Sequence, residues 1–251
     1  MVPDIAWQCP LLAAVGVVAG VLNVIAGGGS MLTLPLLIFM GLPSATANGT
    51  NRVAILCQNI VAVRGFRKQG VFPAKLAFLC TGPALVGSYF GARMAVNIDD
   101  QLFNRVLAVI MVGVLVLTLV DPARRWQIKA CHMTPLRTGV LLLSFFGIGI
   151  YGGCVQAGVG FFIISALLVH GLDLVRINAV KVFVIVAFNI VALVVFMGHG
   201  QVNYGLGFSL AAGNSIGGWI GSHLAVKKGH DWIRKIVFLM VLVFAVKLLV
   251  W

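Results

Sequence analysis

Residues 182–197, VFVIVAFNIVALVVFM, decide the class of fold, because Asn189 is the one polar side chain in the run. Two further apolar runs cover residues 102–120 and 236–250. A helix that spans a bilayer needs roughly 20 predominantly apolar residues. Short charged or Gly/Pro-containing breaks separate the runs. The sequence therefore predicts an all-α polytopic membrane protein.

The overall composition supports the same prediction. Hydrophobic residues make up 61% of the chain and charged residues only 10%, whereas soluble domains carry about 25% charged residues. The net charge of +12 does not indicate nucleic-acid binding, because the Lys and Arg residues lie mainly between the apolar runs. The five cysteines include no CxxC pair, so we predict buried thiols and neither a metal nor a cofactor.

The two halves of the chain are similar to each other after a shift of 130 residues. Asn and Gly matches carry the most weight, since Leu and Val coincide by chance in any membrane protein. The predicted units are a first transmembrane repeat (1–120), a basic cytoplasmic linker (121–137) and a second repeat (138–251). The matched pairs are Asn48 with Asn178, Asn59 with Asn189, Gly70 with Gly200, Gly87 with Gly217 and Gly91 with Gly221.

Each repeat is predicted to begin with a broken, re-entrant helical hairpin and to continue with three spanning helices. The hairpins cover residues 11–41 and 139–171. The spans cover residues 44–64, 73–95 and 102–120 in the first repeat, and 174–197, 203–226 and 232–250 in the second.

The positions of the basic residues predict that the repeats are inverted. If each half crosses the membrane an odd number of times, the basic loops 64–70, 121–137 and 227–235 share one side. The N-terminus and loops 97–101 and 197–203, which contain no Lys or Arg, then share the other. The positive-inside rule places the basic loops in the cytoplasm of a bacterial-type inner membrane and both termini outside. Inverted repeats with broken helices are a common plan of transporters.

Glycines interrupt both hairpins. The first break, residues 23–30, contains Asn23, Gly27, Gly28, Gly29 and Ser30, and the second, residues 152–160, contains Gln156, Gly158 and Gly160. A non-helical backbone at membrane depth must be buried in protein or line a wet cavity, and a helix that starts at a break presents free N–H groups to an anion. We expect these residues to bind substrate. The alternative is that the glycines only permit close helix packing, as we expect for Gly87, Gly91, Gly217 and Gly221.

A polar stripe follows each hairpin. Asn48, Asn51 and Arg52 share a helix face in the first repeat, and Asn178 and Lys181 lie on the corresponding face of the second. Charged side chains inside a membrane are costly and suggest function, so we expect these residues to contact substrate as well. In the alternative, Arg52 and Lys181 snorkel to the interface.

Acidic groups are scarce in this sequence. It contains no Glu, and its six aspartates lie in loops or near the termini. Proton relays and cation sites in membranes usually need buried carboxylates. The remaining basic groups, amides and Gly backbones suit an oxyanion. An intramembrane enzyme is disfavoured, since no HExxH motif or intramembrane acid pair occurs.

Two segments of each repeat resemble the TauE/SafE family of sulfite exporters and related anion transporters. They are NVIAGGGSMLTLPLL (23–37) and ANGTNRV (47–53) in the first repeat, and GCVQAGVGF (153–161) and GLDLVRINAVK (171–181) in the second, with AVKKGHDWI (225–233) further on. The second break contains AGVG where the family commonly has GGG. The resemblance implies export of sulfite, sulfoacetate or a similar sulfur-containing anion, with uptake in some members.

The leading hypothesis is an anion transporter that works by alternating access, with the anion held between the repeats. A passive anion channel and an uptake permease for sulfonates remain the alternatives. The expected partners are the anion and the lipid bilayer. The sequence leaves the oligomeric state open.

Overall fold

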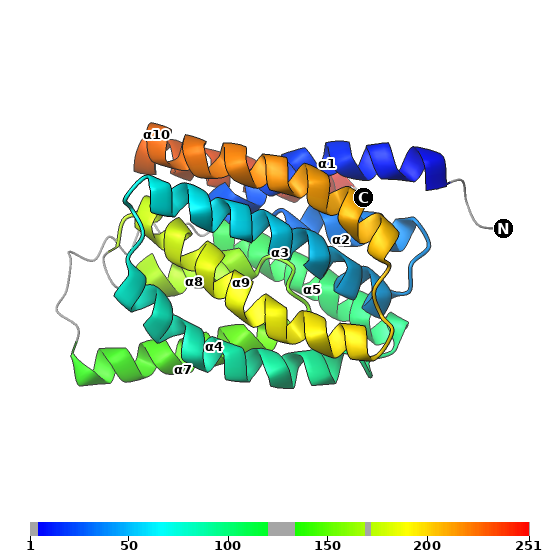
Figure 1. Ribbon diagram of the computed structural model, residues 1–251, viewed down its shortest axis with the longest axis horizontal. Coiled ribbons are helices and arrows are strands. Elements are labelled where there is room, and N and C mark those ends of the chain that lie inside the picture. The colour runs from blue at the N-terminus through cyan, green and yellow to red at the C-terminus, as the bar shows by residue number, and fades with distance from the viewer. Residues whose placement is uncertain (1–4, 120–133, 169–171, 251) are drawn as a thin grey trace.

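The computed structural model describes residues 5–119, 134–168 and 172–250, and every regular element within these ranges is an α-helix (Figure 1). The expected linker therefore lies almost entirely outside the described residues. The helices are α1 (Ile5–Ala26), α2 (Ser30–Phe39), α3 (Ser44–Lys68), α4 (Ala74–Ala95), α5 (Asp100–Leu119), α7 (Pro135–Cys154), α8 (Val159–Leu168), α9 (Leu174–Gly198) and α10 (Tyr204–Val250).

The order of these helices matches the expected order of elements. Helices α1 and α2 form the first broken hairpin, and α7 and α8 form the second. Helix α10 covers the last two expected spans, and Gly229 divides it into two helices with a φ of 75°. Glycine adopts this left-handed conformation without steric cost. The helical assignment and the positions of both breaks are confirmed.

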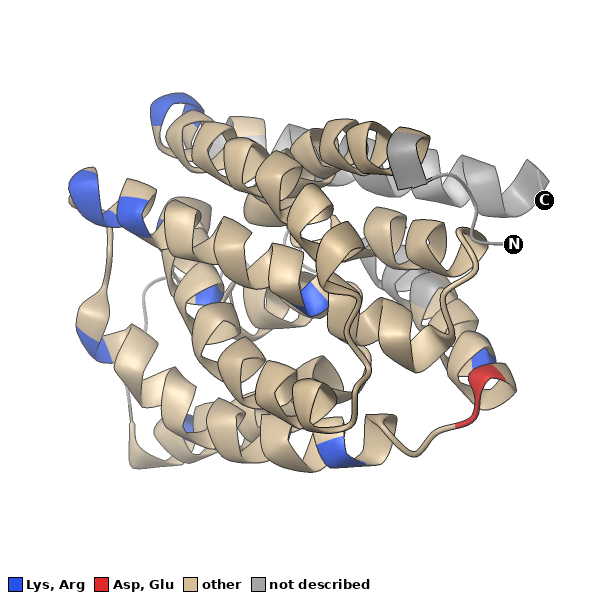
Figure 2. Ribbon diagram, turned by 45° about the vertical axis from the view of Figure 1, so that its right-hand side comes forward, with Lys and Arg blue, Asp and Glu red and all other residues tan. Residues whose placement is uncertain are grey.

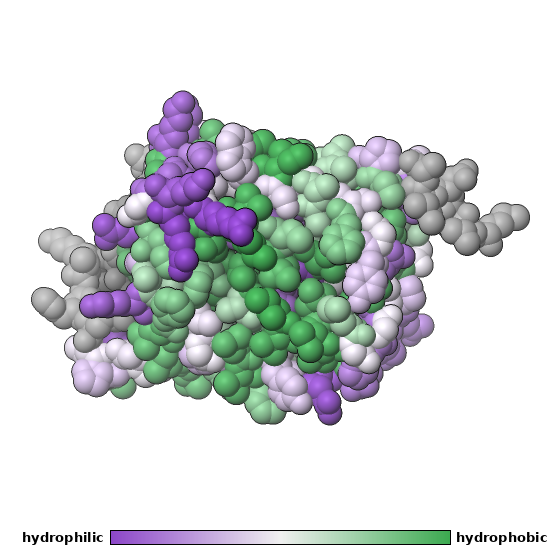
Figure 3. All heavy atoms as spheres, viewed as in Figure 1, coloured by the Kyte–Doolittle hydropathy of each residue, from purple (hydrophilic) through white to green (hydrophobic). Residues whose placement is uncertain are grey.

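The surface of the protein suits a lipid environment. Helices α1, α7 and α9 each contain a segment long and apolar enough to cross a membrane, at 20, 20 and 25 residues. Figure 3 shows a hydrophobic belt between two more hydrophilic ends. Large apolar side chains on the outside include Phe78, Phe90, Val194 and Phe208, which are 52–63% exposed. In water these exposed side chains would be a liability, so the belt faces lipid.

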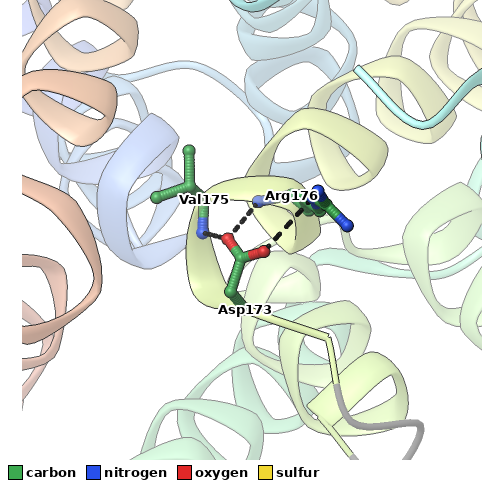
Figure 4. Close-up of polar contacts among 3 residues, drawn as sticks. All are labelled: Asp173, Val175 and Arg176. Atoms are coloured by element: carbon green, nitrogen blue, oxygen red, sulfur yellow. Dashed lines mark hydrogen bonds and ion pairs between the residues drawn. The ribbon is translucent and has the colours of Figure 1, made fainter. Parts of the chain in front are cut away.

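The aspartates whose side chains the structure describes lie at helix starts, as expected. Asp173 precedes α9, and its Oδ1 accepts hydrogen bonds of 3.0 Å from the backbone N–H groups of Val175 and Arg176 (Figure 4). Asp100 begins α5, and its Oδ1 accepts from the N–H of Ser44 at the start of α3, at 2.8 Å. A carboxylate at a helix N-terminus satisfies free N–H groups and is favoured by the helix dipole.

The first helix of each half packs against the other half. Gly217 of α10 lies directly on the backbone of α1 at Val17 and Gly20, and Gly87 of α4 lies on the backbone of α7 at Phe146. A Cβ at either glycine would collide with a backbone carbonyl oxygen. Gly91, Gly213 and Gly221 make further approaches of this kind. The glycines expected to permit close packing do so, and the helices they join belong to opposite halves of the sequence.

The loops gather at two ends of the helix bundle. The α3–α4 connection and the bend of α10 lie at one end, and the α4–α5 and α9–α10 connections lie at the other (Figure 1). Figure 2 shows Lys and Arg concentrated at the first of these ends, to which Arg67, Lys68, Lys227 and Lys228 contribute. Helices α3 and α9 run in opposite directions, since Gly49 near the start of α3 lies against Phe196 near the end of α9 and Gln201 just after it.

Candidate functional site

The two helix breaks touch each other inside the protein. Gly27 directly follows α1 and has a φ of +86°, and a Cβ at this position would lie 2.5 Å from the Cα of Gly160. A Cβ on Gly160 would in turn collide with the Cα of Gly27. Close packing is therefore one reason for glycine at both positions. The contact brings the start of α8 against the first break, so the two breaks lie in one buried region.

A buried lysine holds the end of α1. The Nζ of Lys181 on α9 donates to the backbone carbonyls of Asn23 at 3.1 Å and Val24 at 2.8 Å. It also donates to Oδ1 of Asn178 at 2.7 Å. The Nδ2 of Asn178 donates to the carbonyl of Ile25 at 3.1 Å. The last carbonyls of a helix lack intrahelical partners, and α9 supplies donors to this end of α1, where the carbonyl of Asn23 also accepts from the N–H of Gly27 at 2.9 Å.

A buried arginine holds the end of α7 in the same way. The Nη2 of Arg52 on α3 donates to the carbonyls of Gly152 at 3.1 Å and Gly153 at 2.5 Å. The Nδ2 of Asn48 donates to the carbonyl of Cys154 at 2.7 Å. The guanidinium carbon of Arg52 also lies 4.8 Å from the ring centroid of Phe196, within the range of a cation–π contact.

The two anchors are reciprocal between the halves. A cation and an asparagine on α3 bind the end of α7, and a cation and an asparagine on α9 bind the end of α1. Positive charge is favoured at the C-terminal end of a helix dipole. Arg52 and Lys181 are both fully buried, so the alternative in which they snorkel to the membrane interface is wrong.

The anchors differ in how many donors they leave free. An ammonium group has three N–H donors, and Lys181 uses all three on two carbonyls and one amide. Arg52 has five N–H donors, and its Nε is buried without a hydrogen-bond partner. An anion can be bound by Arg52 without breaking the anchor, whereas Lys181 has no donor to spare.

Several other buried polar atoms near the two breaks lack partners. Gln156 is 1% exposed, and neither atom of its amide has a partner. Its φ of 65° is the left-handed value that non-glycine residues rarely adopt. The Nδ2 of Asn51 and the Oδ1 of Asn48 are also unpaired. The Oδ1 of Asn51 accepts from Thr33 of α2 at 2.7 Å, which leaves its Nδ2 as the free end.

At the first break, the groups near the buried region are mainly backbone groups. Gly28 and Gly29 accept hydrogen bonds from the N–H groups of Met31 and Leu32, at 3.0 Å each. Ser30 begins α2 and is 3% exposed, and no side chain caps this helix start. Gly29 packs against the backbone of Ala19 in α1. At the second break, Gly158 has a φ of +71° and allows α8 to begin at Val159.

The structure thus brings the sequence-predicted residues into one buried region. Asn23 contributes its carbonyl to Lys181 and its amide to Gln58. The sequence did not single out Thr33, because the corresponding position of the second repeat is apolar. It did not single out Phe196 either, which is one of many apolar residues in its helix. No side-chain pattern reveals the carbonyls of Gly152 and Gly153. Sequence reasoning also missed two buried amides away from the second break, Gln58 and Asn214. The sequence did indicate both residues, because a polar amide within an apolar run is costly in a membrane and therefore suggests a role.

Within the described residues, no three His, Cys, Asp or Glu side chains are grouped as metal ligands would be. The polar atoms of the site are amides, one guanidinium, one ammonium and backbone groups. Such a set offers mostly N–H donors, which suit an anion.

Comparisons with known proteins agree with one another. The family model for the sulfite exporter TauE/SafE matches residues 12–248. A probable membrane transporter protein of Haemophilus influenzae is 27% identical over 240 residues, which cover 95% of this chain and 93% of the relative. The probable membrane transporter protein YfcA of Escherichia coli K12 is 26% identical, over 95% of this chain and 88% of the relative. A Sinorhizobium protein, ORF9, is also described as a probable membrane transporter protein. It is 24% identical over 92% of this chain and 88% of the relative. No solved structure matches the chain.

Proposed function

This chain belongs to the sulfite exporter TauE/SafE family, and on that premise we propose that it exports a small sulfur-containing anion such as sulfite or sulfoacetate. Its relatives are described as membrane transporters. One observation carries the choice of an anion: three buried N–H groups near the breaks, one of them on a cation, lack partners, against two unpaired amide oxygens, those of Asn48 and Gln156. The donors are the Nε of Arg52, the Nδ2 of Asn51 and the Nε2 of Gln156.

The proposed site lies at the second break, where α3 meets the end of α7 and the start of α8. The anion's oxygens accept hydrogen bonds from Arg52, Asn51 and Gln156, and Arg52 neutralises its charge. The free N–H groups at the starts of α2 and α8 favour negative charge nearby. Lys181 and Asn178 support this site from a distance by holding α1, with its first break, against Gly160.

The repeats are proposed to have inverted topology. The opposite directions of α3 and α9, the reciprocal anchors and the two glycine-packed helix pairs all support this relationship. The moving bodies of an alternating-access cycle would then be the glycine-packed pairs, α1 with α10 and α4 with α7, since each joins helices from both halves. The anion would pass between them at the level of the touching breaks.

The orientation is proposed to place the basic end of the bundle in the cytoplasm of a bacterial inner membrane, with both termini outside. An inside-negative potential then draws the anion outward. This driving force is about 2.3 kcal/mol per charge for each 100 mV. Uniport is therefore sufficient for export, and no coupling ion is required by the energetics.

The test is sulfite flux into proteoliposomes, with sulfate, sulfoacetate and thiosulfate as competitors. The Arg52→Ala protein is the comparison, and a variant in an exposed charge, Lys75→Ala, is the matched control. Saturable sulfite flux that Arg52→Ala abolishes and Lys75→Ala keeps supports the proposal. Full flux through correctly folded Arg52→Ala protein would contradict the assignment of the site.

The same vesicles separate a carrier from a passive channel and from an uptake permease. A carrier accelerates the exchange of labelled sulfite when unlabelled sulfite is present on the opposite side, whereas a channel does not. Preloading the vesicles with a sulfonate tests whether it, and not sulfite, is the exchanged anion. Flux that ignores an imposed membrane potential would contradict uniport.

A further inference from the structure

A second group of unpaired amides lies apart from the second break. Gln58 on α3 and Asn214 on α10 are both fully buried. The Oε1 of Gln58 accepts from the Nδ2 of Asn23 at 3.3 Å, while its Nε2 has no partner. Neither amide atom of Asn214 has a partner. Buried amides are expected to have hydrogen-bond partners. The unpaired atoms of these two side chains are therefore able to bind a ligand.

The two amides lie along one seam between α1, α3 and α10. A Cβ at Gly218 would lie 2.9 Å from the Cγ of Gln58, and Asn214 is one helical turn before Gly218 on the same face of α10. A Cβ at Gly16 of α1 would lie 3.2 Å from the Oδ1 of Asn214. Gly16, Gly20 and Gly218 let the backbones of α1, α10 and α3 pack closely around the two amides.

The free atoms of this seam are mostly donors. The Nε2 of Gln58 and the Nδ2 of Asn214 carry two N–H groups each, against a single free acceptor, the Oδ1 of Asn214. Cation sites need an excess of oxygen ligands, so this set does not suit one. An oxyanion, which only accepts, fits the set.

The seam also lies between the first site and the basic end of the bundle. Gln58 follows Asn51 by two helical turns on the same face of α3, about 10 Å along the axis. Beyond Gln58, the exposed Arg64, Arg67 and Lys68 complete the helix at the basic end of the bundle. We propose that Gln58 and Asn214 form a second binding position for the transported anion, between the basic end and the site at Arg52. This proposal rests on the proposed function.

The test compares equilibrium binding with flux. Sulfite binding to the purified protein is measured by calorimetry, and maximal sulfite flux is measured in proteoliposomes. The variants are Asn214→Leu, which removes no hydrogen bond to protein, and Gln58→Met as a second, independent change. Thr81→Val is the control, because Thr81 is a buried polar residue on α4 that bonds only to the Ala77 carbonyl of its own helix.

We expect both variants to bind sulfite with unchanged affinity at the Arg52 site and to lose maximal flux by about fivefold or more, the effect of one lost hydrogen bond. Wild-type flux through folded Asn214→Leu or Gln58→Met protein would overturn the second position. So would an equal loss of binding and flux, which would mean a single site. Absence of sulfite flux in the wild-type protein would instead contradict the proposed function, so the two failures are distinguishable.

Discussion

Arg52 of α3 and Asn189 of α9 exchange two hydrogen bonds across the centre of the molecule. The Nη1 of Arg52 donates to Oδ1 of Asn189 at 3.3 Å, and the Nδ2 of Asn189 donates to the backbone carbonyl of Arg52 at 2.8 Å. Both residues are fully buried. The arginine at the proposed anion site is therefore held by both halves of the chain. Its position depends on how α3 and α9 pack against each other.

Replacing Arg52 with lysine separates charge from geometry. An ammonium keeps the positive charge but cannot reproduce the planar fork that reaches Gly152, Gly153 and Asn189 together. We expect Arg52→Lys to fold with a loss of about 1–3 kcal/mol in stability and to transport sulfite slowly. Thermal unfolding in detergent, followed by Trp fluorescence, gives the first quantity, and vesicle flux gives the second. Transport at the wild-type rate would show that only the charge matters.

Lys181 is expected to stabilise the fold without binding the anion. Lys181→Met removes three hydrogen bonds, leaves the carbonyl of Val24 without its ammonium partner and leaves that of Asn23 with only the N–H of Gly27, so stability should fall by about 2 kcal/mol or more. The fraction that folds should bind sulfite with the affinity of the wild type. Calorimetry on protein purified by size exclusion provides this comparison. A large loss of affinity in well-folded Lys181→Met protein would place the ammonium in direct contact with substrate.

Gln156 should show a conflict between stability and function. An unsatisfied buried amide costs about 1–3 kcal/mol, so Gln156→Leu should raise the unfolding temperature while weakening sulfite binding. Gln156→Gly is the companion variant, since it relieves the left-handed φ of 65° and also removes the amide. If neither variant changes sulfite affinity, Gln156 is not part of the site.

The contact between the breaks predicts a difference among glycine substitutions. Gly160→Ala should prevent folding or strongly destabilise the protein, because the new methyl group would collide with backbone at Gly27. Gly147→Ala is the control, since a Cβ there meets nothing within 4 Å. This control should be neutral, or stabilising by up to about 1 kcal/mol. The expression level and the unfolding temperature of the two variants are compared. Equal values for Gly160→Ala and Gly147→Ala would contradict the close contact between the breaks.

The proposed orientation can be tested with single cysteines in a background without the natural ones. Lys68→Cys and Lys228→Cys should react with an impermeant maleimide only from the cytoplasmic side, and Asn97→Cys only from outside. The three positions lie in or beside connections at the two ends of the bundle. Labelling of Lys68→Cys and Lys228→Cys from opposite sides would exclude inverted repeats.

Sequence reasoning predicted the helices and both breaks because these features follow from local properties. Apolar length, glycine clusters and the repeat are all visible along the chain. It also predicted that Arg52 and Lys181 are special, since a charge in an apolar environment is costly. The partners of these cations could not be predicted, because they are backbone carbonyls of the other half, and their identity depends on how the helices pack. The exchange of α1 and α7 between the halves was hidden for the same reason.

The reciprocal anchors have a consequence for how the protein is made. The end of α1 enters the membrane long before the ribosome has synthesised Lys181, which follows Ile25 by about 156 residues, or about 8–30 seconds at ~5–20 residues per second. Throughout this interval the carbonyls of Asn23 and Val24 lack the ammonium that binds them in the finished protein. The nascent first half must therefore stay loosely inserted, or be held by a chaperone or by water, until α9 arrives. Translation of the second half is thus a step in the folding of the first.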